Sequence, residues 1–147
     1  MAPQYKLTYF NARGLAEPVR LLLAHANIEL EDVRVDGSGW AQIKSDSPWG
    51  KLPLLEEGGF KLSQSLAILK YLASKYGYVG ETSQETARMD EYIGAIMDLR
   101  EVIMSYHWEK DPEKKEEKGV KLEEETFPFY LAKFENILKK TETNPPG

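Results

Sequence analysis

The hydrophobic pattern of the chain changes once, near residue 80 of its 147 residues. Before that point short apolar segments alternate with helical patterns, and after it apolar residues recur only at helical spacing. Strands mixed with helices, followed by helices alone, indicate an α/β unit and then an all-α unit. We predict one domain over residues 1–78 and a second, helical domain over residues 82–147.

The first domain begins with a β-α-β pattern. The segment 5–10 is rich in aromatic and β-branched residues and is predicted to be a strand. A helix is expected from about residue 15 to residue 26, and the alternating segment 30–35 is predicted to be a second strand. This order favours a parallel strand pair joined by a right-handed crossover.

The rest of the first domain is predicted to be ββα. A short helix is expected near Trp40–Lys44, then strands at 52–56 and 60–62 around a turn at 57–59. A helix follows, with Ser63, Gln64 and Ser65 as N-cap candidates. Its predicted core stripe consists of Leu66, Leu69, Leu72 and Ala73.

The second domain shows no strand pattern. Thr82 and Glu85 have the spacing of a capping box, and a helix is predicted from there to about Trp108. Residues 109–125 contain eight acidic residues and five lysines, which we interpret as a solvated loop or helix face, with an acidic interaction surface as the alternative. A last helix is predicted from about residue 126 to residue 140.

Composition excludes several classes of function. The absence of cysteine excludes a cysteine nucleophile and thiolate zinc sites, and the aspartates do not have metal-ligand spacing. The net charge of −5 is concentrated after residue 80, so we expect no nucleic-acid partner. No apolar run is long enough to cross a membrane and no secretory signal is visible, so we expect a cytoplasmic protein without a membrane partner.

The residues that could carry chemistry lie where predicted strands end. Tyr9 closes the first strand, where a phenol either donates to an anion or is a half-buried aromatic residue. Pro53 in a strand suggests either an edge position or a cis bond that exposes its neighbours' backbone groups. Ser65 could cap its helix or bind a carboxylate there. Trp40 and Lys44 are spaced to share one face of a helical turn.

Each of these residues alone is a weak signal, but taken together they form a pattern that is specific to one protein family. The chain resembles the cytosolic glutathione transferases, most closely the sigma class, which includes glutathione-dependent prostaglandin D synthases and the lens S-crystallins. The resemblance rests on these segments: Tyr9-Phe10-Asn11-x-Arg13-Gly14, Trp40-x-x-x-Lys44, Pro48-Trp49-Gly50-Lys51-Leu52-Pro53 and Gln64-Ser65-x-Ala67-Ile68. It implies a thioredoxin-like N-terminal domain, an α-helical second domain, a homodimer, glutathione as co-substrate and a small hydrophobic electrophile.

The resemblance also implies a role for each site residue. Tyr9 is expected to be catalytic, with a hydroxyl that stabilises the glutathione thiolate. Lys44 is expected to reach the glycyl carboxylate, and Asp98 the γ-glutamyl amine bound by a partner subunit. The backbone of Leu52, before a cis Pro53, is expected to hold the cysteinyl moiety. The remaining expected glutathione-binding residues are Phe10, Trp40, Lys51, Gln64 and Ser65.

The chain also departs from that family. Leu15 replaces an arginine of the prostaglandin synthases, and Gly94 and Met97 replace acids that bind a divalent cation there, so we expect neither that isomerase activity nor a metal. The chain is also shorter at its C-terminus than the family, so we expect a partial helical domain. The apolar stripe of its last helix would then lose its usual cover. This stripe consists of Phe127, Leu131, Phe134 and Leu138.

Three functions follow from this comparison. The first is an enzyme that conjugates the glutathione thiolate to small electrophiles, as in detoxification. The second is a non-catalytic protein of crystallin type, although a purely structural descendant does not need a complete set of glutathione contacts. The third is a glutathione-binding protein with weak turnover, because C-terminal helices of the family are missing.

Overall fold

A computed structural model describes residues 3–143 of the chain, with side chains described to residue 140. The chain divides into two compact units, Met1–Val79 and Gly80–Gly147. Residues 144–147, which the predicted second domain includes, lie outside the described residues.

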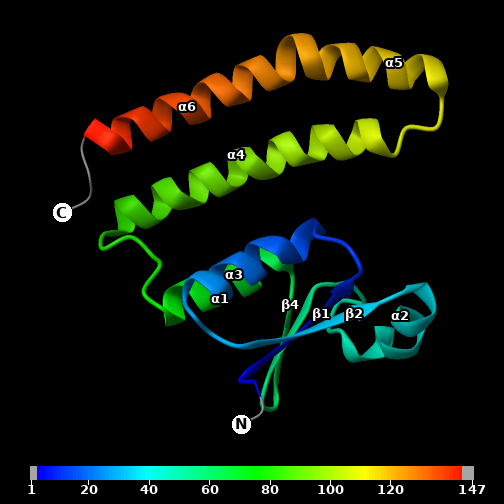
Figure 1. The fold of residues 1–147 in the computed structure, drawn as a ribbon, viewed down its shortest axis with the longest axis vertical. Coiled ribbons are helices and arrows are strands. Elements are labelled where there is room, and N and C mark those ends of the chain that lie inside the picture. Colours follow the sequence, from blue (N-terminus) through cyan, green and yellow to red (C-terminus); the bar gives the residue numbers. More distant parts are fainter. Residues whose placement is uncertain (1–2, 144–147) are drawn as a thin grey trace. The chain divides into compact units, whose positions relative to one another are not determined.

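The first unit is a four-stranded mixed sheet with helices (Figure 1). The strands are β1 (Tyr5–Phe10), β2 (Leu30–Val35), β3 (Leu54–Glu57) and β4 (Phe60–Ser63), in the spatial order β2-β1-β3-β4. β1 and β2 are parallel, whereas β3 is antiparallel to both of its neighbours. This βαβ-ββα topology confirms the predicted thioredoxin-like fold.

Three α-helices belong to this unit: α1 (Glu17–His25), α2 (Gly37–Ile43) and α3 (Ser65–Lys75). Turns of 3-10 helix precede α1 and follow α2, at Gly14–Ala16 and Lys44–Asp46. The expected short helix near Trp40 therefore begins earlier than predicted. Its N-terminus is set by Asp36, whose carboxylate accepts hydrogen bonds from the Gly39 N–H and the Ser38 hydroxyl, both at 2.7 Å.

The core of this unit lies between the sheet and helices α1 and α3. Tyr5 and Leu7 of β1 are fully buried, as is Leu55 of β3. Helix α1 contributes Val19 and Leu23 to this core, and both are buried.

The predicted core stripe of α3 is only partly right. Leu72 is fully buried as expected, but Leu66 is 36% exposed and Leu69 is half-buried. The second core position of the helix is Ile68, which lies one turn before Leu72 and is fully buried. Both Leu66 and Ile68 have apolar partners at helical spacing, so the pattern alone does not select the face that meets the sheet.

Glu57 links the sheet to the C-terminal end of α3. Its carboxylate accepts hydrogen bonds from the Tyr71 hydroxyl at 2.5 Å, from the Lys75 ammonium and from the Gln4 amide at 2.8 Å. The hydrogen bond from Lys75, followed by the one from Tyr71, lowers the pKa of Glu57 to about 2.

This network predicts an acid-dependent stability contribution. A carboxylate whose pKa is depressed on folding stabilises the fold above its unfolded pKa of about 4.3, and that contribution is lost as the pH falls toward about 2. The free energy of urea unfolding of the native chain should therefore exceed that of Glu57→Gln at neutral pH, and the difference should shrink below about pH 4. A difference that stayed constant across this acidic range would contradict the assigned contacts.

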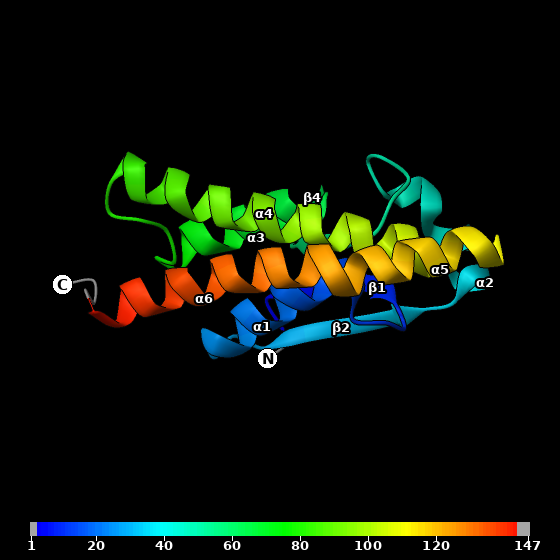
Figure 2. The same cartoon turned by 90° about the horizontal axis from the view of Figure 1, so that it is seen from above.

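The second unit is a helical hairpin. α4 (Ser83–His107) runs antiparallel to a second arm, which consists of α5 (Pro112–Lys121), a π-helical turn (Leu122–Thr126) and α6 (Phe127–Thr143) (Figures 1 and 2). The highly charged segment is therefore mostly helix rather than loop. The predicted capping box is present, since the Thr82 hydroxyl accepts from the Glu85 N–H at 3.2 Å and the Glu85 carboxylate accepts from the Thr82 N–H at 3.0 Å.

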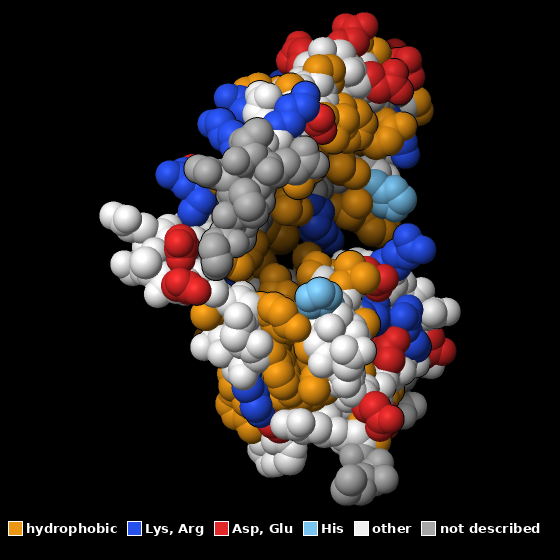
Figure 3. Space-filling view, turned by 60° about the vertical axis from the view of Figure 1, so that its left-hand side comes forward, with side chains coloured by type: hydrophobic (Ala, Val, Ile, Leu, Met, Phe, Trp, Pro, Cys, Tyr) orange, Lys and Arg blue, Asp and Glu red, His pale blue; other side chains and the backbone are white. Residues whose placement is uncertain are grey.

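The hairpin has few buried side chains. Leu122 is the one hydrophobic residue classed as buried among the described part of this unit. Hydrophobic side chains are visible on the surface of the unit (Figure 3). The predicted apolar stripe of α6 is divided: Leu131 and Leu138 are about 60% exposed, whereas Phe127 and Phe134 are half-buried.

Gly80 allows the chain to pack closely against the start of α4. A Cβ atom at this position would lie 2.6 Å from the Thr86 backbone nitrogen and also collide with Glu85. We expect Gly80→Ala to lower the free energy of unfolding by about 1–3 kcal/mol, because the nearest atoms, Glu85 Cβ and the Thr86 nitrogen, are fixed by the backbone of a capped helix.

Gly94 provides the matched control. It lies within α4, and apart from its chain neighbours and the nearby helix backbone, no described atom lies within 4 Å of the place that a Cβ atom would occupy there. Gly94→Ala should therefore stabilise the helix by about 0.5–1 kcal/mol. Urea unfolding followed by circular dichroism measures both variants, and equal effects of the two substitutions would contradict this account.

Candidate functional site

The topology of the sheet gathers most predicted site residues at one edge. β1, β2 and β4 run in the same direction, so their carboxyl ends lie together with the start of the antiparallel β3. In the register of the sheet, Thr8 is opposite Leu54, and Leu54 is opposite Ser63. The segments that follow β1, β2 and β4 and precede β3 therefore meet at this edge.

Tyr9 lies near the end of β1 and is only 9% exposed. Its hydroxyl oxygen accepts a hydrogen bond from the backbone N–H of Leu15 at 3.2 Å. A phenol can accept and donate at the same time, and no acceptor for its proton is found among residues 3–140. The hydroxyl of Tyr9 can therefore donate a hydrogen bond to a bound group.

An aromatic row connects Tyr9 with α2. The rings of Tyr9 and Phe10 meet edge to face with their centroids 5.7 Å apart, and those of Phe10 and Trp40 do so at 6.3 Å. Lys44 follows α2 and is exposed. Its side chain passes Gly50, because its Cε atom lies 3.6 Å from the place that a Cβ atom of residue 50 would occupy. The structure thus brings these predicted residues to the same side of the unit.

The segment before β3 is braced by a buried serine. The Ser47 hydroxyl donates to the Lys51 carbonyl at 2.6 Å and accepts from the Lys51 N–H at 3.2 Å. The following Leu52–Pro53 bond is cis, one of the two alternatives that the sequence left open. Leu52 is half-buried and Pro53 is buried.

Gln64 and Ser65 lie where β4 gives way to α3. Gln64 has a φ of +74°, which is uncommon for a residue other than glycine, and its side chain makes no capping hydrogen bond. Ser65 is the first residue of the helix and is half-buried. The N-terminal N–H groups of α3 and the positive end of its dipole therefore favour an anion at this position.

Asp98 is the one predicted site residue that belongs to the second unit of the chain. It lies in α4 of the second unit and is exposed. Its expected role depends on a partner subunit and stays a prediction.

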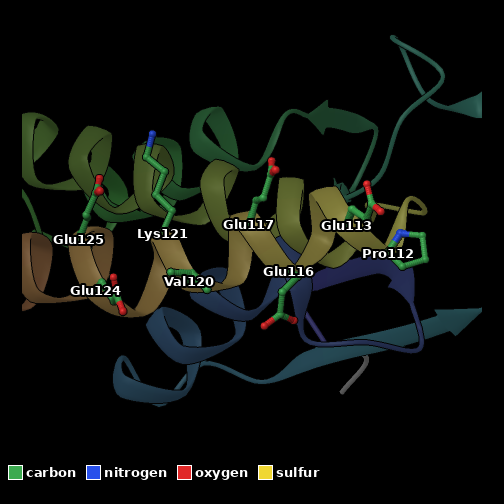
Figure 4. A pocket seen from close by; sticks show the side chains of 8 residues that line it. All are labelled: Pro112, Glu113, Glu116, Glu117, Val120, Lys121, Glu124 and Glu125. Carbon is green, nitrogen blue, oxygen red and sulfur yellow. The ribbon is translucent and has the colours of Figure 1, made fainter.

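A groove along α5 has a different chemical character. Five glutamates line it together with Pro112, Val120 and Lys121, and none of them is a predicted site residue (Figure 4). Within residues 3–143, no cluster of three or more potential ligands suits a metal ion, and no helix has the length and apolar character needed to cross a membrane.

Sequence reasoning missed the residues that support the site. Ser47 and Gly14 act through Lys51 and Tyr9, which lie four and five positions away in the sequence. Ser63 is 3% exposed, and its hydroxyl has no hydrogen-bond partner among the described residues. The Asp36-Gly37-Ser38-Gly39 segment did carry a usable signal, because an aspartate followed by small residues is a common helix start.

Comparison with known proteins agrees with this geometry. Residues 5–74 match the family described as "Glutathione S-transferase, N-terminal domain", and residues 97–144 match "Glutathione S-transferase, C-terminal domain". A glutathione S-transferase of Anopheles gambiae is 38% identical over 94% of this chain and 68% of its own length. Glutathione S-transferase S1 of Drosophila melanogaster is 40% identical over 94% of this chain, which corresponds to 55% of the relative.

Prostaglandin synthases are also among the similar proteins. The hematopoietic prostaglandin D synthase of Gallus gallus is 46% identical over 78% of this chain and 56% of its own length. The solved prostaglandin synthase D of Nilaparvata lugens matches with a TM-score of 0.85 and 39% identity, over 95% of this chain and 70% of the other. The chain thus spans about 55–68% of the length of these curated relatives. The sigma-class resemblance is confirmed, and the chain belongs to the glutathione S-transferase family.

Proposed function

We propose that this chain binds glutathione at the edge of its sheet and conjugates the glutathione thiolate to small hydrophobic electrophiles. The observation that carries the proposal is the hydroxyl of Tyr9. Its oxygen accepts a hydrogen bond from the Leu15 N–H, so its own proton can be donated to a bound group. Family membership supports glutathione as the co-substrate.

The surrounding groups suit the parts of a small acidic peptide. The N-terminus of α3, with Gln64 and Ser65, suits the carboxylate of the γ-glutamyl end. The backbone of Leu52 suits the cysteinyl amide, and the ammonium of Lys44 suits the glycyl carboxylate. The remaining proposed contacts come from Phe10, Trp40, Lys51 and Pro53.

The proposed chemistry starts from the thiol of glutathione. A free thiol has a pKa near 8.5, so only about a few per cent of it is thiolate at pH 7. A hydrogen bond from Tyr9 to the charged sulfur contributes about 1.5–3 kcal/mol, which lowers the thiol pKa by about one to two units. The thiol proton leaves to solvent, and a sulfur electron pair forms a C–S bond while the leaving group departs with the electrons of the broken bond.

Two measurements on one sample test the proposal. Isothermal titration calorimetry should show glutathione binding, and a conjugation assay with an aromatic electrophile should show turnover that depends on glutathione. Binding without turnover would instead indicate a glutathione-binding protein, and the absence of both would indicate a non-catalytic, crystallin-like protein.

We also propose that the chain forms a homodimer and is cytoplasmic. The role of Asp98 depends on the dimer, since it would reach the glutathione of the partner subunit. Light scattering on the purified protein should give twice the mass of the 16.8 kDa chain. A monomer that binds glutathione with the same affinity as its Asp98→Asn variant would refute this role.

A further inference from the structure

The turn between β1 and α1 contains a glycine that faces the Tyr9 hydroxyl. Gly14 has a φ of +47°, a conformation that other residues rarely adopt. A Cβ atom at this position would lie 2.6 Å from the Tyr9 hydroxyl oxygen and 2.8 Å from Cε1 of the ring. Any side chain at residue 14 would therefore displace the phenol.

The residue after this glycine contacts the same oxygen through its backbone. The Leu15 N–H donates to the Tyr9 hydroxyl at 3.2 Å, so it occupies an acceptor position of that oxygen. Because the N–H fixes where the oxygen accepts, it also restricts the direction in which the phenol can donate its own proton. The side chain of Leu15 is not needed for this contact.

Arg20 holds the turn in place from α1. Its Nη1 atom donates to the carbonyl oxygens of Ala12 and Arg13, at 3.2 and 3.3 Å. The guanidinium also pairs with Glu17 at 2.9 Å and with Asp32 of β2 at 3.0 Å, and the arginine side chain is only 12% exposed. The turn is thereby tied both to the following helix and to the neighbouring strand.

We propose that Gly14 and the Leu15 backbone N–H, held by Arg20, are positioning groups that aim the Tyr9 hydroxyl at the glutathione sulfur. This inference rests on the proposed role of Tyr9. Gly14 leaves room for the phenol, the Leu15 N–H orients its oxygen, and Arg20 keeps both in register with the strand. None of these groups has to touch glutathione.

Gly14→Ala tests the inference, with Gly58→Ala as the matched control. Gly58 also has a positive φ, +56°, but apart from its chain neighbours no described atom lies within 4 Å of its Cβ position. The two readouts are turnover and the pH midpoint of the ultraviolet absorbance of bound thiolate. Gly14→Ala should reduce turnover about 10- to 100-fold and move the midpoint toward that of free glutathione, because the donor is misplaced. Gly58→Ala should change neither.

A double variant shows whether the effect passes through the hydroxyl. In a Tyr9→Phe background, Gly14→Ala should cause little further loss of turnover, since the ring is still displaced but the hydroxyl that it would misplace is already absent. If Gly14→Ala does not fold, replacing Leu15 by its α-hydroxy acid removes the N–H without adding atoms. That ester variant should raise the thiolate midpoint and reduce turnover about three- to tenfold.

The outcomes separate the positioning role from the proposed function. If Tyr9→Phe lowers turnover but the substitutions at residues 14 and 15 leave the thiolate midpoint unchanged, the positioning role is wrong and the function stands. The same conclusion follows if Gly14→Ala is equally harmful with and without the Tyr9 hydroxyl. If Tyr9→Phe itself changes neither readout, both the role of Tyr9 and the inference are overturned.

Discussion

Replacing Tyr9 by phenylalanine is expected to lower the turnover number about 100-fold and to leave glutathione affinity nearly unchanged. Tyr9 is 9% exposed, and the substitution keeps its ring and removes only the hydroxyl. That hydroxyl is proposed to act on the charged sulfur, and the groups proposed to bind the two carboxylates of glutathione are left unchanged. Steady-state kinetics and calorimetric titration measure the two quantities separately.

The pH dependence of this variant gives a stricter test. Without the hydroxyl, the thiol of bound glutathione should titrate close to its free pKa of about 8.5. The value of kcat/KM for the electrophile is measured with glutathione bound at saturation. The ratio of this value in the native chain to that in the variant should therefore be large at neutral pH and smaller as the pH rises above about 8.5. Tyr78→Phe serves as the control, because this half-buried tyrosine lies beside His25 with the ring centroids 5.2 Å apart, and is not a proposed site residue. Equal turnover of native chain and Tyr9→Phe would remove Tyr9 from the mechanism.

Local sequence patterns were sufficient to predict the four strands and two of their pairings, but not the pairing of β1 with β3 that completes the strand order. β1 contains adjacent aromatic and β-branched residues, and a helix with a clear apolar face separates it from β2, so the parallel pair could be predicted. Gly58 marks the turn between β3 and β4, which are antiparallel as expected. These elements are specified by neighbours in the sequence, and few distant contacts are needed to define them.

The site was predicted less completely than the fold. Tyr9, Trp40 and Lys44 could be selected because they belong to short motifs at strand ends or on one helical turn. The supporting contacts of Gly14 and Arg20 could not, because each depends on how a turn folds back on a strand. A glycine pattern does not reveal that a tyrosine ring five residues earlier fills the space of the missing side chain.

The helical unit shows another limit of pattern reasoning. Apolar residues at helical spacing predicted α6 well, yet they did not indicate which side meets α4. Tyr130, Phe134 and Ile137 line a cavity of about 210 Å³ with residues of α4, whereas Leu131 and Leu138 are exposed. A broad apolar surface on a helix allows several packing faces, and the partner helix determines which of them is used.

Leu72→Ala should cause a large loss of stability. Leu72 is fully buried against the core of the sheet unit, and such a truncation costs about 2–5 kcal/mol through lost burial and the cavity that remains. Leu66→Ala removes the same atoms from the same helix at a site that is 36% exposed, so its cost should stay below about 1 kcal/mol. Urea denaturation of both variants measures this difference. Similar losses at the two positions would contradict the orientation of α3 in the structure and support the core stripe predicted from the sequence. The reason is that only a helix rotated toward Leu66 would bury both leucines.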